Sequence, residues 1–172
     1  MNKQTKMEVI GTKKFGPKID ITDPCYDKNT WCRKNNVEIK QGEYTCAVWM
    51  ATEPLTWDGE TYDNTLVAVI GIYLNGEIPA ENDMEKIGTI GVDAGLAGFF
   101  ENKPDYTDDK WDNICQTARE GKAWIIEEGF FSQSGYGDGT YSVFAHKNEN
   151  IDAYTAVEIR FFDTDDNNND DE

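Results

Sequence analysis

The chain has 172 residues, of which 38% are hydrophobic and 12% aromatic. Because a chain of this length buries a sizeable core, we expect a single β-rich domain over residues 1–162. The 33 Asp and Glu residues against 16 Lys and Arg residues give a formal net charge of −17, which works against binding to nucleic-acid backbones and to anionic membranes.

Part of this charge is local. Six of the acids lie in residues 163–172, which leaves a net charge of −11 on the rest of the chain. The tail holds only polar residues and cannot bury enough apolar surface to offset its chain entropy, so we expect it to be disordered. The body of the protein is therefore acidic in its own right.

The cysteines and the N-terminus indicate where the protein acts. The four cysteines lack the C-x-x-C spacing of zinc sites, and His146 is the only histidine, so we expect no structural zinc. Residues 1–6 are polar, and the longest apolar run, residues 66–74, is too short to span a bilayer. We expect a cytoplasmic protein with reduced thiols.

Short runs of alternating or β-branched residues predict strands in the first half of the chain. Residues 66–74 are rich in β-branched types, which predicts a central strand that is buried on both faces. Asn75-Gly76 ends this run with a tight turn of positive φ. Residues 54–64 are polar and predict a loop or the tip of a hairpin. The other strands expected here span residues 19–22, 37–39 and 44–50.

The second half of the chain holds the one predicted helix. Residues 107–119 carry apolar side chains at the spacing of one helical face, acids in the first turn and Gly121 past the end. Residues 93–100 combine Gly and Ala, which indicates closely packed or sharply turning backbone, or a turn of helix. The further strands span residues 87–92, 124–131, 141–146 and 154–162. This pattern predicts a mainly β (α+β) fold, an antiparallel β-sandwich or barrel with one short amphipathic helix.

Three segments hold an aspartate among turn residues, namely Asp23, Asp93 and Asp138. In one interpretation the three carboxylates converge at one end of the sandwich, where they and bared backbone carbonyls hold Ca²⁺ or Mg²⁺. In the other, each aspartate bonds backbone N–H groups of its turn. The second is favoured because the spacing does not match the calcium-binding loop.

Tyrosines accompany these aspartates and extend the candidate ligand-binding set to Tyr26, Tyr136 and Tyr141. The last two can stack on a sugar or a base, although packing in or beside the sheet is the favoured explanation. No catalytic set stands out. Residues 135–139 lack the Lys and Ser or Thr that follow a phosphate-binding loop, and His146 lies in no nucleophile motif. With 33 acids, no carboxylate pair is informative, so we name no catalytic residue and leave enzymatic activity open.

The three segments, in this order, resemble a family of uncharacterised small β proteins of bacteria and phages. That family carries a D-P-C-Y segment near the start, a V-D-A-G segment in the middle and an S-G-Y-G-D-G-x-Y segment before the last strand. The matching residues here are 22–26, 91–100 and 134–141. Because the family has no assigned activity, the resemblance implies a mostly β fold and no catalytic residues.

Two functions of different classes follow. The first is a non-enzymatic acidic binding protein that occupies a protein partner with a basic surface, for example as a phage or mobile-element inhibitor or regulator. The competing explanation of the charge is solubility alone. The second function is a divalent-metal or small-molecule site at Asp23, Asp93 and Asp138, for which the sequence leaves a hydrolytic activity open. The sequence leaves the oligomeric state open.

Overall fold

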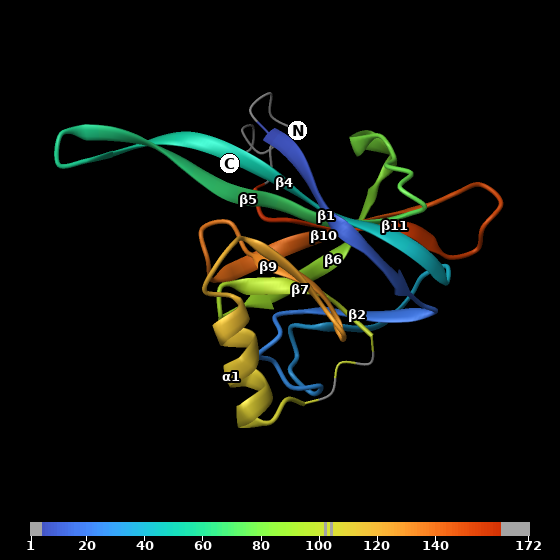
Figure 1. Cartoon of the computed structure of the whole chain (residues 1–172). Helices are drawn as coiled ribbons and strands as arrows, with labels where there is room; N and C mark the ends of the chain where they lie inside the picture. Colours follow the sequence, from blue (N-terminus) through green and yellow to red (C-terminus); the bar gives the residue numbers. More distant parts are fainter. Residues whose placement is uncertain (1–4, 102, 104, 163–172) are drawn as a thin grey trace.

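The chain folds into two β-sheets that face each other, with one α-helix beside the smaller sheet (Figure 1). This is a computed structural model, and it describes residues 5–101, 103 and 105–162. The elements are β1 Thr5–Phe15, β2 Lys18–Thr22, β3 Lys34–Glu38, β4 Gly42–Trp57, β5 Glu60–Leu74, the 3₁₀ helix η1 Glu81–Asp83, β6 Glu85–Val92, β7 Leu96–Phe100, α1 Asp108–Thr117, β8 Ala123–Ile126, β9 Gly129–Gln133, β10 Gly139–Lys147 and β11 Tyr154–Arg160.

The ladders of both sheets are antiparallel. The six-stranded sheet has the order β1-β4-β5-β11-β10-β6, and the five-stranded sheet has the order β3-β2-β7-β9-β8. The two sheets approach each other along one side where β1 passes β8, and the ammonium of Lys13 donates to the carbonyl of Glu127 there at 2.8 Å. The predicted mainly β, sandwich-like fold with one helix is confirmed.

The core lies between the two sheets. Strand β5, an interior strand of the six-stranded sheet, contributes to it. Residues 67–73 of this strand are buried without a break, which confirms the prediction of a strand covered on both faces. One face packs into the main core through side chains such as Ile70 and Ile72. The other face packs Tyr73 against Ala47, Met84 and Ala156, where the segment around η1 covers the sheet. Asn75 and Gly76 then turn the chain with positive φ, as predicted.

A strand that the sequence does not predict, β1, forms one edge of the six-stranded sheet. It pairs with β4 from Thr5↔Ala51 to Phe15↔Gly42, and the register shifts between Val9 and Gly11. This bulge interrupts the alternation of apolar and polar side chains, and most of the strand is exposed, so its hydrophobic pattern is weak. Edge strands are typically charged and irregular, because these features prevent the edge from pairing with another chain.

The loop or hairpin tip predicted over residues 54–64 is a hairpin tip, and its strands are far longer than predicted. The chain turns at Asp58 and Gly59, which both have positive φ. β4 and β5 stay paired from there to Tyr44↔Leu74. Among the described residues, β1 pairs no further than Ala51 and β11 no further than Val69. Residues 52–65 form a two-stranded ribbon, the arm, which projects from the body (Figure 1, teal to green).

Two predictions in the second half of the chain are corrected. The single strand expected over residues 124–131 is two strands, β8 and β9, because Glu127 and Glu128 form a turn between them. Residues 93–100 form no helical turn. The chain bends at residues 93–95, with positive φ at Gly95, and continues as the fully buried strand β7. Glycine at position 98 lets β7 pack closely, because a Cβ there would overlap the backbone of Phe130.

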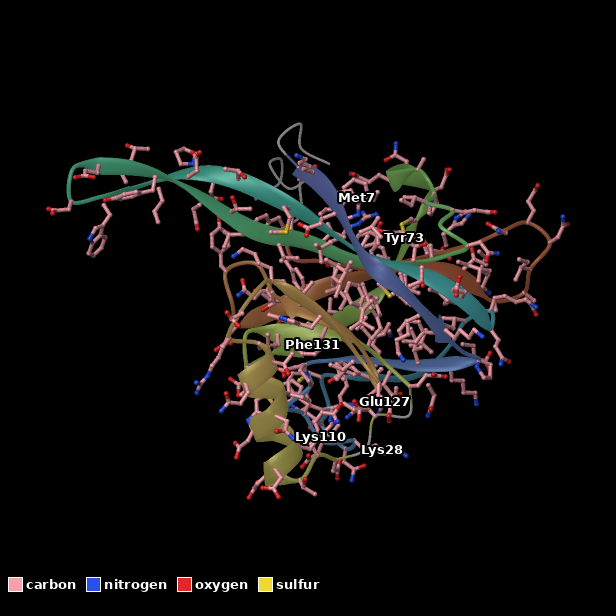
Figure 2. All side chains as sticks on the ribbon, in the orientation of Figure 1. Met7, Lys28, Tyr73, Lys110, Glu127 and Phe131 are labelled. Carbon is pink, nitrogen blue, oxygen red and sulfur yellow. The ribbon has the colours of Figure 1, made fainter. Side chains whose placement is uncertain are left out.

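The predicted helix is confirmed as α1. Thr107 caps its N-terminus, since the Thr107 hydroxyl accepts from the backbone N–H of Lys110 at 3.2 Å. Ile114 is buried against a cluster that includes Leu96 and Phe131, so the helix covers the outer face of the five-stranded sheet (Figure 2).

The expected acidic tail, residues 163–172, lies outside the described residues. Among the helices that the structure describes, neither is long and apolar enough to cross a membrane.

A buried polar network fixes the outer face of the six-stranded sheet around Tyr73 (Figure 2). The hydroxyl of Tyr73 accepts from the indole of Trp49 at 3.0 Å and donates to Glu158 at 2.7 Å. Arg160 in turn donates to Glu158 at 3.0 Å. Burial first, and then the neighbouring Glu158 carboxylate, hold the pKa of Tyr73 well above its usual value.

This network needs a glycine at position 71. A Cβ added to Gly71 would overlap the hydroxyl and ring of Tyr73, which its hydrogen bonds hold in place. We expect Gly71→Ala to lower the free energy of unfolding by about 1–3 kcal/mol, because the buried ring must shift. Urea unfolding of both proteins measures the change, and an unaltered midpoint would show that Tyr73 moves freely.

Candidate functional site

The three aspartate-bearing segments meet at one end of the sandwich, and Asp23 joins the first two. The Asp23 carboxylate is fully buried. One carboxylate oxygen accepts a hydrogen bond from the backbone N–H of Cys25 at 2.8 Å. The other oxygen accepts hydrogen bonds from the backbone N–H groups of Asp93 and Ala94, both at 2.7 Å. The third segment adjoins the second, since the N–H of Ser134 donates to the carbonyl of Gly95 at 3.1 Å.

The side chains of the three aspartates do not form one ligand set. Both oxygens of Asp23 accept backbone N–H groups, while Asp93 and Asp138 are exposed. Within the described part of the chain, no group of three or more His, Cys, Asp or Glu side chains is placed to hold a metal ion. Asp23 thus does what the turn interpretation expects, and it also ties its turn to a second one.

Melting temperatures test the metal interpretation directly. We expect Ca²⁺, Mg²⁺ and Mn²⁺ at about 1 mM to leave the melting temperature unchanged, because a site selective for the folded state would raise it by mass action. Scanning fluorimetry with and without EDTA measures this. A rise that is lost in Asp93→Ala or Asp138→Ala would restore the metal hypothesis.

The segment that follows Asp23 carries Tyr26 and two thiols, and its environment suppresses ionisation. Burial, and then the hydrogen bond to Asp23, raise the pKa of the Cys25 thiol to about 12. Burial and the neighbouring Cys32 thiol raise the pKa of Tyr26 above its usual value. A thiol with so high a pKa stays protonated at neutral pH, and the thiol is a poor nucleophile in that form.

A second buried carboxylate, Asp20, holds the same loop and escapes sequence analysis. It accepts from the Arg33 guanidinium at 3.2 Å and from the backbone N–H of Lys103 at 2.9 Å. Arg33 and Lys103 also donate to the carbonyl of Tyr26 at 2.9 and 3.0 Å. Burial, and then the nearby Arg33 charge, lower the pKa of Lys103. These contacts fix the loop, and no signal in the sequence marks the two basic residues as buried.

The two remaining tyrosines have different roles. Tyr141 packs edge-on against Phe161, with ring centroids 5.0 Å apart, and its hydroxyl donates to the carbonyl of Gly137 at 2.6 Å. It holds the glycine-rich turn, as the packing explanation expects. Tyr136 is exposed, stacks on Phe162 at 4.9 Å and donates to Glu53 near the base of the arm.

The only histidine has a structural contact. The imidazole of His146 lies 3.0 Å from the carbonyl of Asp83, measured from Nδ1. This contact joins β10 to the segment around η1.

The feature that sequence analysis misses is the face of the arm. Cross-strand partners share a face, so the pairs Glu53↔Asn64, Leu55↔Tyr62 and Trp57↔Glu60 place their side chains together. Trp57 is 73% exposed, Leu55 49% and Tyr62 47%. We name this set, residues 53, 55, 57, 60, 62 and 64, the apolar–acidic face. Glu53 of this set accepts a hydrogen bond from Tyr136 of the body, and the rest of the arm projects beyond that contact (Figure 2).

The opposite face of the arm, the polar face, carries Pro54 and otherwise polar side chains, and hydroxyl groups pair across its two strands. Thr52 and Thr65 lie 3.0 Å apart, and Thr56 and Thr61 lie 3.3 Å apart, measured between their Oγ1 atoms. A two-stranded ribbon is marginally stable in water, and such cross-strand pairs help to hold it. The arm is therefore an ordered two-stranded ribbon whose two faces carry different types of side chain.

The charge of the arm has one sign. Residues 51–85 contain no Lys or Arg, and the arm carries Glu53, Asp58, Glu60 and Asp63. The sequence carries only a short signal for this face, because apolar and polar side chains alternate at Leu55, Thr56 and Trp57 alone, directly before Asp58-Gly59. Pro54 argues against a central strand, but it is compatible with an exposed ribbon.

Comparisons of the chain with protein-family models, with curated proteins and with solved structures find no match. The resemblance carried by the three aspartate-bearing segments therefore stays a prediction.

Proposed function

We propose that this protein is a non-enzymatic, cytoplasmic binding protein that occupies a basic surface of a protein partner through the apolar–acidic face of its arm. Its class is that of an inhibitor or regulator such as phages and mobile elements encode, which competes with nucleic acid for the same basic surface. The observation that carries this proposal is a projecting ribbon that exposes Trp57, Leu55 and Tyr62 among acids.

The chemistry of this face suits a protein interface. Trp and Tyr contribute the largest share of binding energy in protein interfaces, where a few central side chains dominate. Monomeric proteins rarely expose large contiguous apolar patches unless the patch binds a partner. Among the described residues Trp57 is mostly exposed and Leu55 is half exposed, so a groove on a partner is where these side chains would be buried.

The acids around these side chains determine which partner fits. Glu53 and Glu60 flank the apolar residues on the same face, and the protein carries a net charge of −17. The negative electrostatic field of these acids raises the rate of association with a basic surface and disfavours binding to an acidic surface. We infer a groove with an apolar floor and a rim of Lys or Arg.

Affinity capture at two salt concentrations tests the proposal. The full chain is immobilised and exposed to a lysate at about 0.05 M and about 0.5 M NaCl, beside the variant Leu55→Ala/Trp57→Ala. We expect a basic protein to be retained by the native arm at low salt only, and not by the variant. Equal retention by the variant would show that the arm is not the binding surface.

A further inference from the structure

The arm contacts the body near its base through Glu53. The hydroxyl of Tyr136 donates a hydrogen bond to the Glu53 carboxylate, and the two residues lie 83 positions apart in the sequence. Among the described residues, the other side-chain hydrogen bonds of the arm lie within it and join Thr52 to Thr65, Thr56 to Thr61 and Tyr62 to Glu60. The contact between Tyr136 and Glu53 is therefore the one that ties the arm to the body in the described part of the chain.

Open space adjoins the base of the arm on its polar face. A hollow of about 610 Å³ lies there, and its lining includes Thr52 and Thr65 of the arm, Lys6 and Glu8 of β1, and Lys122. The base of the arm thus borders a cavity at these two threonines. Because a two-stranded ribbon is marginally stable by itself, its direction depends on the contacts that it makes at its base.

Tyr136 is suited to hold the arm because its own position is fixed. Its ring stacks on Phe162, with the ring centroids 4.9 Å apart. The N–H of Gly137 donates to the carbonyl of Ser134 at 2.9 Å, and the hydroxyl of Ser134 donates to the carbonyl of Gly137 at 2.8 Å. A Cβ at Gly135 would lie 2.9 Å from the ring of Phe162, so the turn packs closely on this ring. Tyr136 therefore projects from a closely packed, hydrogen-bonded turn.

A path of hydrogen bonds connects this turn to the buried Asp23. The Asp23 carboxylate accepts two backbone N–H groups of the second aspartate-bearing segment, and the Gly95 carbonyl of that segment accepts the N–H of Ser134 at 3.1 Å. Ser134 begins the turn that carries Tyr136, and Tyr136 donates to Glu53 of the arm. The three segments that stand out in the sequence thus form one continuous support between the core and the arm.

We propose that Tyr136 is a positioning residue, which fixes the direction of the arm through Glu53, and that the three aspartate-bearing segments support it. The hydrogen bond to Glu53 raises the pKa of the Tyr136 hydroxyl, which therefore remains a donor at neutral pH. A fixed arm presents Trp57 and Leu55 in one orientation, which lowers the entropy cost of binding a partner. This consequence rests on the proposed function, whereas the direction of the arm is measured without any partner.

The distance between two spin labels measures the direction of the arm in the full chain. The labels are attached to azide-bearing amino acids that replace Thr61, on the polar face of the arm, and Asn113, an exposed residue of α1. These amino acids leave the four free cysteines unchanged. The arm and α1 extend from the body in different directions, so a change in the direction of the arm changes this distance (Figure 1). Double electron–electron resonance gives the distribution of distances.

We expect a single narrow distribution in the labelled protein and one that is at least about 2-fold broader in Tyr136→Phe, which keeps the ring on Phe162 and loses the donor. Glu53→Ala should broaden the distribution equally, and the double variant no further, because both changes remove the same contact. Glu53→Gln keeps an acceptor oxygen and should keep the distribution narrow.

A broad distribution in the labelled protein, or a narrow one in Tyr136→Phe, would overturn the proposal. A double variant broader than either single variant would also overturn it, because the two residues would then act separately. Since Tyr136 is 68% exposed, Tyr136→Phe should change the melting temperature by less than about 2 °C, so the broadening reports the arm and not unfolding. A fixed arm whose face captures no partner would contradict the proposed function and leave this inference standing.

Discussion

Replacing Asp23 by alanine is expected to lower the free energy of unfolding by about 3–4 kcal/mol. The buried carboxylate accepts three backbone N–H groups, from Cys25, Asp93 and Ala94, and each buried donor left without a partner costs about 1–3 kcal/mol. Asp23→Asn retains one carbonyl oxygen and should lose roughly half as much. Chemical denaturation followed by tryptophan fluorescence measures these differences.

The controls are the two aspartates that share the segment pattern but not the burial. Asp93 and Asp138 are exposed, so Asp138→Ala should change the free energy of unfolding by less than about 0.5 kcal/mol. Asp93→Ala keeps the backbone N–H that Asp23 accepts, and should be similarly mild. Equal losses in all three variants would contradict a structural role that belongs to Asp23.

Replacing Trp57 by alanine is expected to weaken partner binding about 100-fold, or about 2.7 kcal/mol. Trp57 is the largest and most exposed apolar side chain of the apolar–acidic face, so its burial in a partner groove supplies the largest single contribution. Most of the loss should appear as faster dissociation, because interface truncations act mainly on that rate. Surface plasmon resonance with the captured partner measures both rates.

The matched control lies on the other face of the same ribbon. Thr61 pairs with Thr56 on the polar face, so Thr61→Ala should change the affinity less than about 3-fold. Glu60→Gln should slow association at low salt and have little effect at high salt, because it removes one charge from the acidic field. A similar loss from Thr61→Ala and Trp57→Ala would mean that the ribbon is needed only for stability.

The strands that can be predicted from the sequence are those whose side chains are buried. Residues 66–74 are predicted because both faces of β5 meet apolar neighbours, so β-branched residues follow one another. β1 cannot be predicted in the same way. It is an edge strand with Lys6, Glu8 and Lys13 and a bulge, features that protect an edge from pairing with other chains and also erase the alternation.

The contacts of the site are less predictable than the fold. Asp23 is recognisable as a turn aspartate, but two of its donors come from residues 93 and 94, which the fold alone brings beside it. Arg33 and Lys103 look like surface residues, because nothing local in a sequence tells a buried cation from an exposed one. The donors of Asp23 and the burial of Arg33 and Lys103 both depend on contacts between residues that are far apart in the sequence.

The arm shows a different limit of sequence analysis. Alternation over Leu55, Thr56 and Trp57 indicates that Leu55 and Trp57 share a face, and Asp58-Gly59 marks the turn. It does not show whether a third strand or a second sheet covers that face. The exposure of Leu55 and Trp57 in the described structure reveals that this face stays outside the core.

Site-specific photo-crosslinking from the two faces of the arm tests the central claim most directly. A benzophenone amino acid replaces Tyr62 on the apolar–acidic face in one protein and Thr61 on the polar face in another. We expect the probe at position 62 to capture a basic protein at low salt, Trp57→Ala to abolish this capture, and the probe at position 61 to capture far less. Equal capture from both positions, or capture that survives Trp57→Ala, would contradict a binding function of the apolar–acidic face.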